Sequence, residues 1–566
     1  MIYGRHIHSR QTLARYLQYI TRHKSIDMHY FHLACNKGED GMTSQQHYIE
    51  SAMNAGDEIL SPALSQGLGD QLAIIDEHES LTYRQLNRRA NQFGNALRSH
   101  GVQPEERVMF LLEDSADMVA AYIGTMRIGA VAIAYNRKAV QRDLVFTINE
   151  SRARFLFIEA DFIDTALELI PQIQHPFTLV VRNGALANHL ATQTLLADSS
   201  PEMDSTPMSP DDMAFWIYTS GTTGKPKAAV HLQHDVIVSD LHLRENLKVQ
   251  PGERVLCTSK FFFAYPLAHG MFGSLRCGAT LILFDGWPTP ERTGTLVETH
   301  RPDLLFSVPT FYRKLLDDGV AKGAAFRSIR CCVSAGEQLP ETLFADWQQQ
   351  TGNAIYEGIG TTETLVLFIV NSPKAHRPGS SGRVVPWAEV RLTDEQGDPI
   401  NTPDTPGVAW LRMPSVCDRY WNRQDMTRQA FNGVWYRTGD IFSFDAEGWW
   451  YHQGRADHML KISGQWVSPS EIEYCALSVP DVGEAAVVET PRSDGPSQIV
   501  LFLKPQHAGV DEQALTRQVR EALHNQLAHF KCPKDVRIID EVPRTATGKI
   551  QKFKLQQLLE ETTPGY

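Results

Sequence analysis

The chain has 566 residues, which is too long for one ordinary hydrophobic core and predicts roughly two to four folding units. Hydrophobic residues make up 42% and charged residues 21% of the chain, as in soluble globular proteins. The formal net charge of −12 argues against nonspecific nucleic-acid binding, although a local basic patch can occur on an acidic protein.

The eight cysteines show no CxxC pair and no other spacing typical of zinc or thioredoxin-like sites. We expect reduced thiols in a cytoplasmic protein. The most apolar stretch, residues 118–135, carries Arg127 and is short for a membrane span of about 20 residues. A buried helix followed by a buried strand explains it better, and no membrane partner is predicted. The cysteines are Cys35, Cys257, Cys277, Cys331, Cys332, Cys417, Cys475 and Cys532.

Residues 1–45 are rich in histidine and arginine and lack the apolar core and cleavage site of a signal peptide. They could form an amphipathic arm, or be sequence upstream of a later start codon at Met42 or Met53. We treat them as a nonessential N-terminal extension of unknown role.

From about residue 60, short apolar strands alternate with amphipathic helices, which predicts an α/β fold. Shorter, polar-alternating strands follow residue 385, and a unit of roughly 110 residues, large enough to fold alone, follows residue 455. We predict a large body (46–455) with two α/β sheets and a small β-rich subdomain, and a small α+β C-terminal lid (456–566). The predicted elements are a hairpin at 73–81, a helix at 86–97, a strand at 108–112, a helix at 115–126, strands at 279–284 and 304–308, a helix from 310, a helix at 468–477, strands at 485–489 and 500–504, and a helix at 511–527.

The run YTSGTTGKPK, residues 218–227, follows an apolar stretch that would end a strand at residue 217. Its glycines allow backbone conformations that turn several N–H groups toward an anion, while its hydroxyls and lysines add donors and positive charge. It is not a Walker A loop, because Pro226 follows Gly-Lys and the glycine spacing is too short. A polyphosphate is the predicted ligand. The assigned residues are Thr219, Ser220, Gly221, Thr222, Thr223, Gly224 and Lys227.

This run resembles the signature loop of the adenylate-forming superfamily, which comprises acyl- and aryl-CoA synthetases, peptide-synthetase adenylation domains and luciferases. The resemblance covers about residues 50–560, with further motifs in the family's order. It implies ATP and Mg²⁺ as cofactors, attack of a carboxylate on the α-phosphorus with loss of pyrophosphate, and transfer of the acyl group to a thiol with loss of AMP.

The next motif, SAGEQLP, reads by itself as a strand end that turns through glycine into a helix. It resembles the family segment that lines the adenine, which assigns Ser334, Ala335, Gly336 and Glu337 to the nucleotide.

The run GIGTTE contributes Gly360, Thr361, Thr362 and Glu363. A carboxylate is the ligand type that Mg²⁺ prefers, so Glu363 is the predicted metal ligand, with Thr362 bonded to the α-phosphate.

Asp440, in WYRTGD, resembles the family aspartate that accepts hydrogen bonds from both ribose hydroxyls. Arg455 would reach the ribose-phosphate region, and the resemblance makes Asp457 the hinge of the C-terminal lid. Rotation of the lid would present Gly464 and Trp466 to the pantetheine of coenzyme A.

Lys549, in PRTATGK, resembles the family's catalytic lysine. A lysine that bridges the acid carboxylate and the anionic α-phosphate would relieve their repulsion and stabilise charge in the transition state, together with Thr362 and Glu363. Nearby lysines remain as alternatives. They are Lys531, Lys534, Lys552 and Lys554.

The run SKFFFAYPLAHG, residues 259–270, resembles the benzoate and hydroxybenzoate CoA ligases, which carry FFAYGLGN there. An aromatic run suits a flat aryl ring, although it could also be ordinary core. Pro266 and Ala268-His269 depart from the pattern, so the ring substituents of the acid stay open. His231, after the phosphate loop, either flanks the site or packs in the core. The assigned acid-binding residues are Phe263, Ala264, Tyr265, His269 and Gly360.

The resemblance implies a benzoate-type CoA ligase with ATP, Mg²⁺ and coenzyme A. Two alternatives remain, a ligase that loads a separate carrier protein and a fatty acyl-CoA synthetase. A nonenzymatic ligand sensor is disfavoured, because Glu363, Asp440 and Lys549 are all present. The sequence leaves a monomer and a homodimer equally open.

Overall fold

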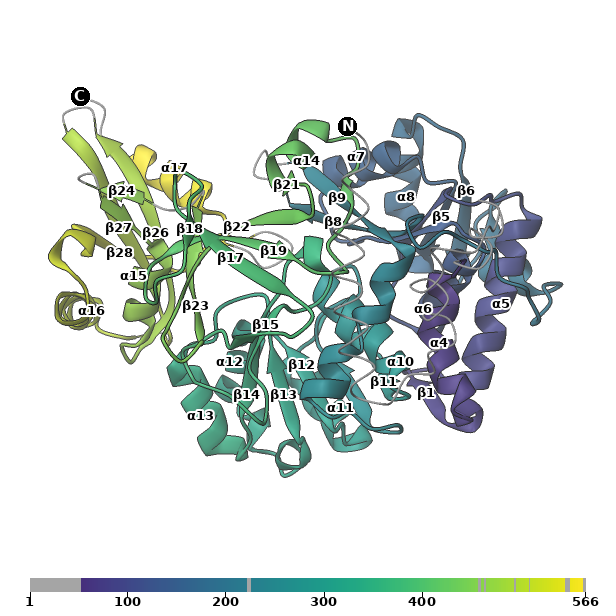
Figure 1. Cartoon of the computed structure of the whole chain (residues 1–566), viewed down its shortest axis with the longest axis horizontal. Helices are drawn as coiled ribbons and strands as arrows, with labels where there is room; N and C mark the ends of the chain where they lie inside the picture. Colours follow the sequence, from purple (N-terminus) through teal and green to yellow (C-terminus); the bar gives the residue numbers. More distant parts are fainter. Residues whose placement is uncertain are drawn as a thin grey trace, which may run out of the picture.

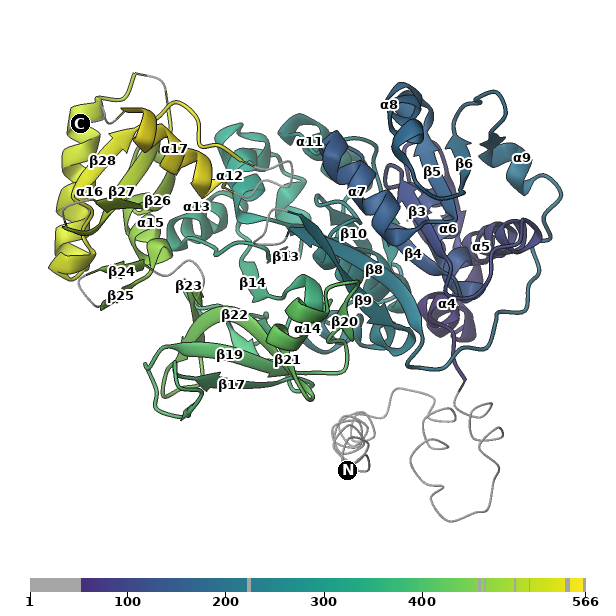
Figure 2. The same ribbon diagram turned by 90° about the horizontal axis from the view of Figure 1, so that it is seen from above.

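The structure is a computed structural model that describes residues 52–220, 225–456, 460–462, 465–492, 495–507, 509–544 and 550–562. Within these residues, a large body with three sheets adjoins a small C-terminal unit (Figure 1). Seen from above, the C-terminal unit lies at one end of the molecule and strands β5 and β6 lie near the other (Figure 2). The fold is therefore mixed α/β, as predicted.

The first sheet has the strand order β20-β9-β8-β4-β3-β5-β6-β7. Its strands from β8 to β7 run parallel, whereas β9 and β20 are antiparallel to their neighbours. The bounds are β3 (Arg107–Leu111), β4 (Val131–Ala134), β5 (Phe155–Glu159), β6 (Thr178–Arg182), β7 (Leu190–Ala191), β8 (Met213–Ser220), β9 (Pro226–Leu232) and β20 (Arg419–Tyr420).

The second sheet has the order β16-β15-β14-β13-β12-β10-β11-β1-β2, with a parallel centre from β14 to β1. The bounds are β1 (Leu72–Ile75), β2 (Ser80–Thr82), β10 (Arg254–Cys257), β11 (Thr280–Ile282), β12 (Leu304–Ser307), β13 (Cys331–Ser334), β14 (Ile355–Ile359), β15 (Ile369–Val370) and β16 (Arg383–Val384).

One hydrophobic core joins α4 (Ala55–Ser65), α5 (Tyr83–Ser99) and α6 (Ala116–Arg127) to one face of each sheet. The parallel strands are apolar on both faces, because helices cover the opposite faces too. In β3, for example, Val108 and Phe110 point into this shared core, whereas Met109 and Leu111 point into a second one.

The remaining helices of the body follow or precede these strands. Their bounds are α7 (Gln141–Ser151), α8 (Ile163–Leu169), α9 (Thr192–Leu196), α10 (Ser274–Arg276), α11 (Pro290–His300), α12 (Pro309–Asp317), α13 (Glu341–Thr351) and α14 (Gln424–Ala430), with π-helical segments η5 (His242–Asn246) and η6 (Pro266–Gly273) and a short 3₁₀ turn η9 (Thr362–Thr364).

A third, antiparallel sheet is built on β17, β19, β22 and β23, and it precedes the C-terminal unit. The bounds are β17 (Glu389–Thr393), β18 (Pro399–Ile400), β19 (Gly407–Arg412), β21 (Phe431–Asn432), β22 (Trp435–Phe444), β23 (Trp450–Arg455), β24 (Leu460–Ile462), β25 (Gln465–Val467), α15 (Pro469–Leu477), β26 (Val482–Arg492), β27 (Gly495–Pro505), α16 (Glu512–Gln526), β28 (Asp535–Ile538) and α17 (Lys552–Thr562).

The C-terminal unit has hydrophobic cores of its own, formed by α15, α16 and α17 against the sheet β26-β27-β28. It also contacts the large body, where Gln506 Nε2 donates to Asp317 Oδ1 at 3.2 Å. At a second contact the backbone N–H of Glu341 donates to the hydroxyl of Tyr474 at 3.3 Å.

The predicted helices and strands are confirmed, with ends that move by a few residues. Strand β27 begins at Gly495, five residues earlier than predicted. At the phosphate loop, β8 continues to Ser220 instead of ending at residue 217. The reason is cross-strand pairing, because Thr219 lies opposite Lys227 and Ser220 lies opposite Pro226. The loop therefore connects two antiparallel strands as a β-hairpin.

The apolar stretch at residues 118–135 is the buried helix α6 followed by the buried strand β4, as predicted. Of the helices that the structure describes, none combines the length and apolar character needed to cross a membrane. The cysteines within the described residues are all free thiols, and Cys35 lies outside them.

Candidate active site

Several predicted site residues lie outside the described residues. They are Gly221, Thr222, Thr223, Gly224, Asp457, Gly464 and Lys549. The described part of the chain contains the remaining predicted residues, except for the side chains of Ser220 and Trp466.

Lys227, the last lysine of the phosphate hairpin, contacts Glu363 of the GIGTTE run. Lys227 Nζ lies 3.2 Å from Glu363 Oε1 and 3.8 Å from the centre of the Tyr420 ring. The Tyr420 hydroxyl donates a hydrogen bond to the same Oε1 at 2.6 Å. Tyr420 reaches this position because β20 pairs with β9, where Tyr420 lies opposite Ala229, two residues after Lys227. A cation and a hydroxyl thus meet one buried carboxylate.

Burial of the Glu363 carboxyl acts to raise its pKa, but the nearby Lys227 charge and the Tyr420 hydrogen bond outweigh this, and the net pKa is lowered. Glu363 is therefore an anion at neutral pH. Both of its side-chain hydrogen bonds from described residues end on Oε1. An ionised carboxylate is the ligand type that a hard cation such as Mg²⁺ prefers, so Glu363 fits the predicted role of metal ligand.

The loop at residues 360–367 is held from the first sheet by His231, which is fully buried. His231 Nε2 lies 2.9 Å from the carbonyl oxygen of Thr362, and its Nδ1 lies 2.8 Å from Asp235 Oδ2. Because a carbonyl oxygen can only accept, Nε2 carries a proton. His231 therefore fixes the backbone beside Glu363. Its ring is also stacked on the buried Phe215 ring at 5.0 Å, so its position agrees with both alternatives, a residue that flanks the site and a packing histidine.

The same loop contains a strained residue directly after the TTE triplet. Leu365 has φ +63° and ψ −54°, and the N–H of Val366 donates to the carbonyl of Thr364 at 2.7 Å. These values describe a γ-turn of the rare, strained kind. Backbone strain of this sort persists only where the surroundings hold it, and it clusters at functional sites.

Leu367 packs where Gly358 and Gly360 carry no side chain. A Cβ on Gly358 would lie 2.6 Å from Leu367 Cδ1, and one on Gly360 would lie 2.9 Å from the carbonyl oxygen of Val366. The predicted Gly360 is thus required for the loop to fold back on β14, a role that does not depend on ligand.

The aromatic run at residues 261–265 reaches the second sheet through Tyr265. The Tyr265 hydroxyl donates to the carbonyl of Val333 in β13 at 3.1 Å, one residue before Ser334. Ala264 is buried, while Phe263 and Tyr265 are partly exposed. The predicted acid-binding and adenine-binding segments are therefore neighbours.

Two further contacts hold this aromatic run. His269, within η6, is fully buried, and its Nε2 accepts the backbone N–H of Leu367 at 3.2 Å. At the other end, the N–H of Phe261 donates to the buried Asp114, whose Oδ2 lies 3.9 Å from Lys260 Nζ. Burial raises the pKa of Asp114 to about 6, against the lowering effect of the Lys260 charge.

In the SAGEQLP segment Ser334 and Ala335 are buried at the end of β13, and Gly336 has φ +90°. A left-handed conformation of this kind favours glycine, and it turns the chain away from the sheet. The residues predicted for adenine thus lie at the carboxyl end of a parallel strand, which is a usual ligand position in an open α/β sheet.

Asp440 and Arg455 lie opposite each other on β22 and β23. Arg455 Nη1 is 3.8 Å from Asp440 Oδ1, and His452 Nε2 is 3.3 Å from the same oxygen. Gly439 has φ +78°, and a Cβ there would lie 2.8 Å from Arg455 Nη2. The glycine of the WYRTGD motif therefore allows the guanidinium to approach the aspartate.

Arg544, which precedes the Lys549 segment, is held within the C-terminal unit, where its Nε donates to Glu484 Oε2 on β26 at 3.1 Å. Burial raises the pKa of Glu337 in the large body, and the nearby Arg544 charge acts to lower it. The chain before Lys549 is thus close to the predicted adenine segment.

Two of the four alternative lysines are held in ion pairs within the C-terminal unit. Lys531 Nζ is 2.7 Å from Glu471, and Lys552 Nζ is 2.8 Å from Glu473. These pairs disfavour Lys531 and Lys552 as the catalytic lysine, whereas Lys534 and Lys554 are exposed and remain alternatives to Lys549.

Sequence reasoning missed Tyr420, Asp235, Asp114 and residues 365–367. No motif marks them, because their contacts join strands that are distant in the chain. The one available signal was the hydrophobic run that follows Glu363, which continues the GIGTTE motif.

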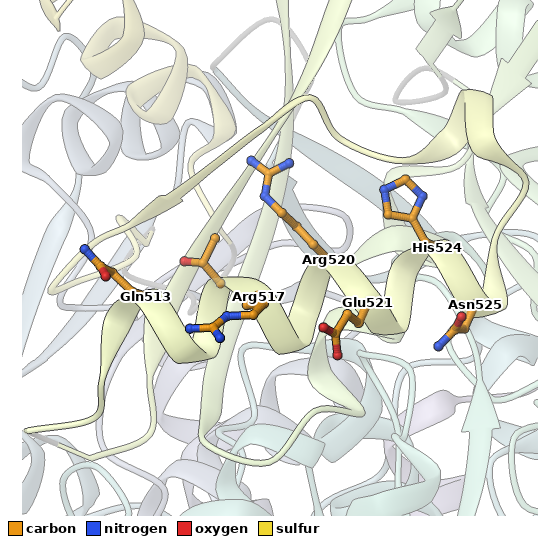
Figure 3. A pocket seen from close by; sticks show the side chains of 7 residues that line it. Gln513, Arg517, Arg520, Glu521, His524 and Asn525 are labelled. Atoms are coloured by element: carbon orange, nitrogen blue, oxygen red, sulfur yellow. The ribbon is translucent and has the colours of Figure 1, made fainter.

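A surface hollow on the C-terminal unit does not belong to this site. It lies along α16 and is lined by polar and charged side chains (Figure 3). Residues assigned to nucleotide, acid or thiol are not among them. The lining residues are Gln513, Thr516, Arg517, Arg520, Glu521, His524 and Asn525.

Known proteins resemble this chain over most of its length. The family model described as AMP-binding enzyme matches residues 64–421, and the model for its C-terminal domain matches residues 471–549. A 3-hydroxybenzoate–CoA ligase from Aromatoleum sp. (strain CIB) is 48% identical over 90% of this chain and 97% of its own length. A 3-hydroxybenzoate–CoA/4-hydroxybenzoate–CoA ligase from Thauera aromatica is 46% identical over 92% of this chain and 100% of its own length. The crystal structure of the anthranilate CoA ligase AuaEII in complex with anthranoyl-AMP superposes with a TM-score of 0.85, at 30% identity, and covers 92% of this chain and 99% of that one.

Proposed function

Because the chain belongs to the AMP-binding enzyme family, we propose that it joins an aromatic carboxylic acid of the benzoate class to coenzyme A at the expense of ATP. It is an AMP-forming acid–thiol ligase. One observation carries the proposal. The loop at residues 360–367 contacts the phosphate hairpin through Glu363 and Lys227, and the aromatic run through Leu367 and His269.

In the first half-reaction the acid carboxylate attacks the α-phosphorus of ATP, a mixed anhydride with AMP forms, and pyrophosphate leaves. The hairpin at 218–227 binds the phosphates, and Thr362 bonds the α-phosphate. Glu363 would hold Mg²⁺, which supplies positive charge to the phosphate oxygens when bound. Lys549 bridges the carboxylate and the α-phosphate, so that two anions can approach.

Nucleotide recognition supports the same assignment. Asp440 accepts the ribose hydroxyls, with Arg455 beside it, and residues 334–337 line the adenine. The pairing of Asp440 with Arg455 on adjacent strands supports this assignment, because it preorganises the carboxylate before the nucleotide binds.

In the second half-reaction the thiol of coenzyme A attacks the acyl carbon and expels AMP. We divide the chain into the body at 46–455 and the lid at 456–566, with residues 1–45 as an extension. Asp457 is the hinge, and Gly464 and Trp466 line the pantetheine channel after the lid rotates. A short connection between β23, which ends at Arg455, and β24, which begins at Leu460, supports a pivot there.

The proposed acid is 3-hydroxybenzoate or a closely related hydroxybenzoate, since the relatives at 48% and 46% identity are ligases for these acids. Phe263, Ala264, Tyr265 and Gly360 would surround the ring. The proposed location is the cytoplasm, where ATP and coenzyme A are available. We leave monomer and homodimer open.

The test is acid-dependent ATP–pyrophosphate exchange over benzoate, its hydroxylated and aminated derivatives, and fatty acids. A second assay then follows formation of the CoA thioester. We expect 3-hydroxybenzoate to give the highest kcat/KM in both assays.

Three outcomes distinguish the alternatives. A preference for medium-chain fatty acids would refute the aryl assignment but leave adenylation intact. Exchange without CoA thioester, together with transfer to a pantetheinylated carrier protein, would favour a carrier-loading ligase. A complete absence of acid-dependent exchange would refute the enzyme assignment and favour a ligand sensor.

A further inference from the structure

The hydrogen bond between His269 and Leu367 determines the protonation state of the imidazole. A backbone N–H can only donate, so Nε2 of His269 must be the unprotonated acceptor in the 3.2 Å contact. The proton therefore sits on Nδ1. His269 is thus a neutral imidazole with a defined tautomer.

The surroundings of His269 favour this neutral form. The side chain is fully buried, and the ring of His242, which is also buried, lies 5.7 Å away at an interplanar angle of 71°. Burial lowers the pKa of His269 to about 3. A buried polar ring is stabilised chiefly by the hydrogen bonds it makes, and for Nε2 this is the bond to Leu367.

The position of His269 depends on a close approach between the backbone of η6 and the backbone at Ser239. Gly273 lies against Ser239, where a Cβ would come within 2.4 Å of the Ser239 carbonyl oxygen. The Ser274 hydroxyl also donates to the carbonyl of His269 at 2.8 Å. These contacts hold the segment that carries the imidazole. The segment η6 is also a π-helix, a form that is frequent at functional sites.

Leu367, the partner of His269, closes a loop that is under strain. The γ-turn at Leu365 lies two residues before it, and the N–H of Phe368 donates to the carbonyl of Ile359 at 2.9 Å just after it. Residues 365–367 are 2–3% exposed. A strained turn persists only where surrounding contacts hold it, and the hydrogen bond that His269 accepts from Leu367 is one of these contacts.

We infer that His269 is a positioning residue for the acid site. It acts through the backbone of Leu367 and sets the shape of residues 365–367. Its ring also lies 6.0 Å from the Tyr265 ring, so it links this loop to the predicted acid-binding segment. This inference rests on the proposed function, because it assigns the segment to binding of the acid. It also revises the expected role of His269, which positions the pocket wall and does not itself contact the ring.

The experiment compares His269→Leu, which cannot accept the Leu367 N–H, with His269→Gln, whose carbonyl oxygen reaches a position close to Nε2. Steady-state pyrophosphate exchange gives KM for the acid and for ATP separately, using the acid that the wild-type enzyme prefers. We expect His269→Leu to raise KM for the acid by about 10-fold or more and to change KM for ATP by about 2-fold or less. His269→Gln should recover most of the loss.

His242→Leu is the matched control, because His242 is a buried imidazole beside His269 that makes no contact with residues 365–367 among the contacts described. We expect a similar decrease in Tm but a KM for the acid within about 2-fold of wild type. If His269→Leu does not fold, His269→Gln and His269→Asn replace it, since the shorter asparagine cannot reach Leu367.

Three results would overturn the inference: equal increases in both KM values, a His269→Gln variant no better than His269→Leu or His269→Asn, or a His269→Leu variant with wild-type KM values. Failure of the proposed function is recognised separately, because it appears in the wild-type enzyme as an absence of exchange with aromatic acids.

Discussion

Lys227 Nζ lies 3.2 Å from Glu363 Oε1, although 136 residues separate the two in the chain. The contact joins the hairpin between β8 and β9 to the loop after β14, and so it connects the two sheets at the site. It also keeps the Glu363 carboxylate ionised in a buried position, where an unpaired charge would be costly.

The first prediction concerns Lys227. Lys227→Met removes a cation from the phosphate site and leaves Glu363 with one partner fewer. We expect kcat/KM for pyrophosphate exchange to fall by about 100-fold or more, since charge stabilisation is the main contribution to phosphoryl and adenylyl transfer. Lys374→Met, which removes an exposed lysine, serves as the control and should retain wild-type activity. A loss of less than 3-fold (about 0.7 kcal/mol) for Lys227→Met would contradict the assignment.

The second prediction concerns the Tyr420 hydroxyl, which donates to Glu363 at 2.6 Å. Tyr420→Phe removes this bond and frees the carboxylate to rotate, so the Mg²⁺ concentration for half-maximal activity should rise by about 5-fold or more. A Mg²⁺ titration of exchange activity measures it. Tyr451→Phe, which removes a hydroxyl bonded to Asp445 in the third sheet, is the control and should leave the titration unchanged. Identical titrations for all three proteins would show that Tyr420 does not position the metal ligand.

The third prediction concerns Asp440. Asp440→Asn keeps the shape of the side chain but removes its charge, so it weakens the bonds to both ribose hydroxyls. We expect KM for ATP to rise by about 10-fold with KM for the acid nearly unchanged. Asp398→Asn, at an exposed position in the same sheet region, is the matched control. A change confined to the acid would argue that Asp440 does not bind ribose.

The fourth prediction separates the two half-reactions. Lys549→Ala should reduce adenylation by about 100-fold or more and largely spare thioester formation from supplied acyl-AMP, because the lysine acts only while phosphate and carboxylate meet. Lys554→Ala, an exposed nearby alternative, should retain both activities. An equal loss in both half-reactions would refute the rotation of the lid between two working positions.

The fifth prediction concerns pH and the buried Glu357 of β14. Burial raises the pKa of Glu357 to about 8, while an unfolded glutamate titrates near 4.5. The folded protein therefore holds the proton between these values, and its stability falls as pH rises from about 4.5 to 8 and then levels off. Relative to Glu357→Gln, which stays neutral, the wild type should lose on the order of 5 kcal/mol across this window. Urea unfolding at pH 5 and pH 9 measures the difference, and a pH-independent difference would contradict it.

Much of the fold could be predicted from local pattern. The apolar periodicity of residues 86–97 predicts a helix, and α5 forms there with a capping box between Thr82 and Gln85. The predicted strand before the phosphate hairpin was too short, because its last residues are polar and only the cross-strand partners Lys227 and Pro226 show that the strand continues. The alternation of apolar residues does not reveal such partners.

The sequence by itself determined the class of chemistry. Short motifs contain the YTSGTTGKPK run, Glu363, Asp440 and Lys549. Their residue types suit phosphate, metal, ribose and carboxylate, so these motifs can be recognised without a structure. Only the tertiary structure decided how these groups are held. Tyr420 reaches Glu363, His231 reaches Thr362 and His269 reaches Leu367 across separate strands and loops. These bonds depend on how the two sheets pack against each other, and packing joins residues that no spacing along the chain relates.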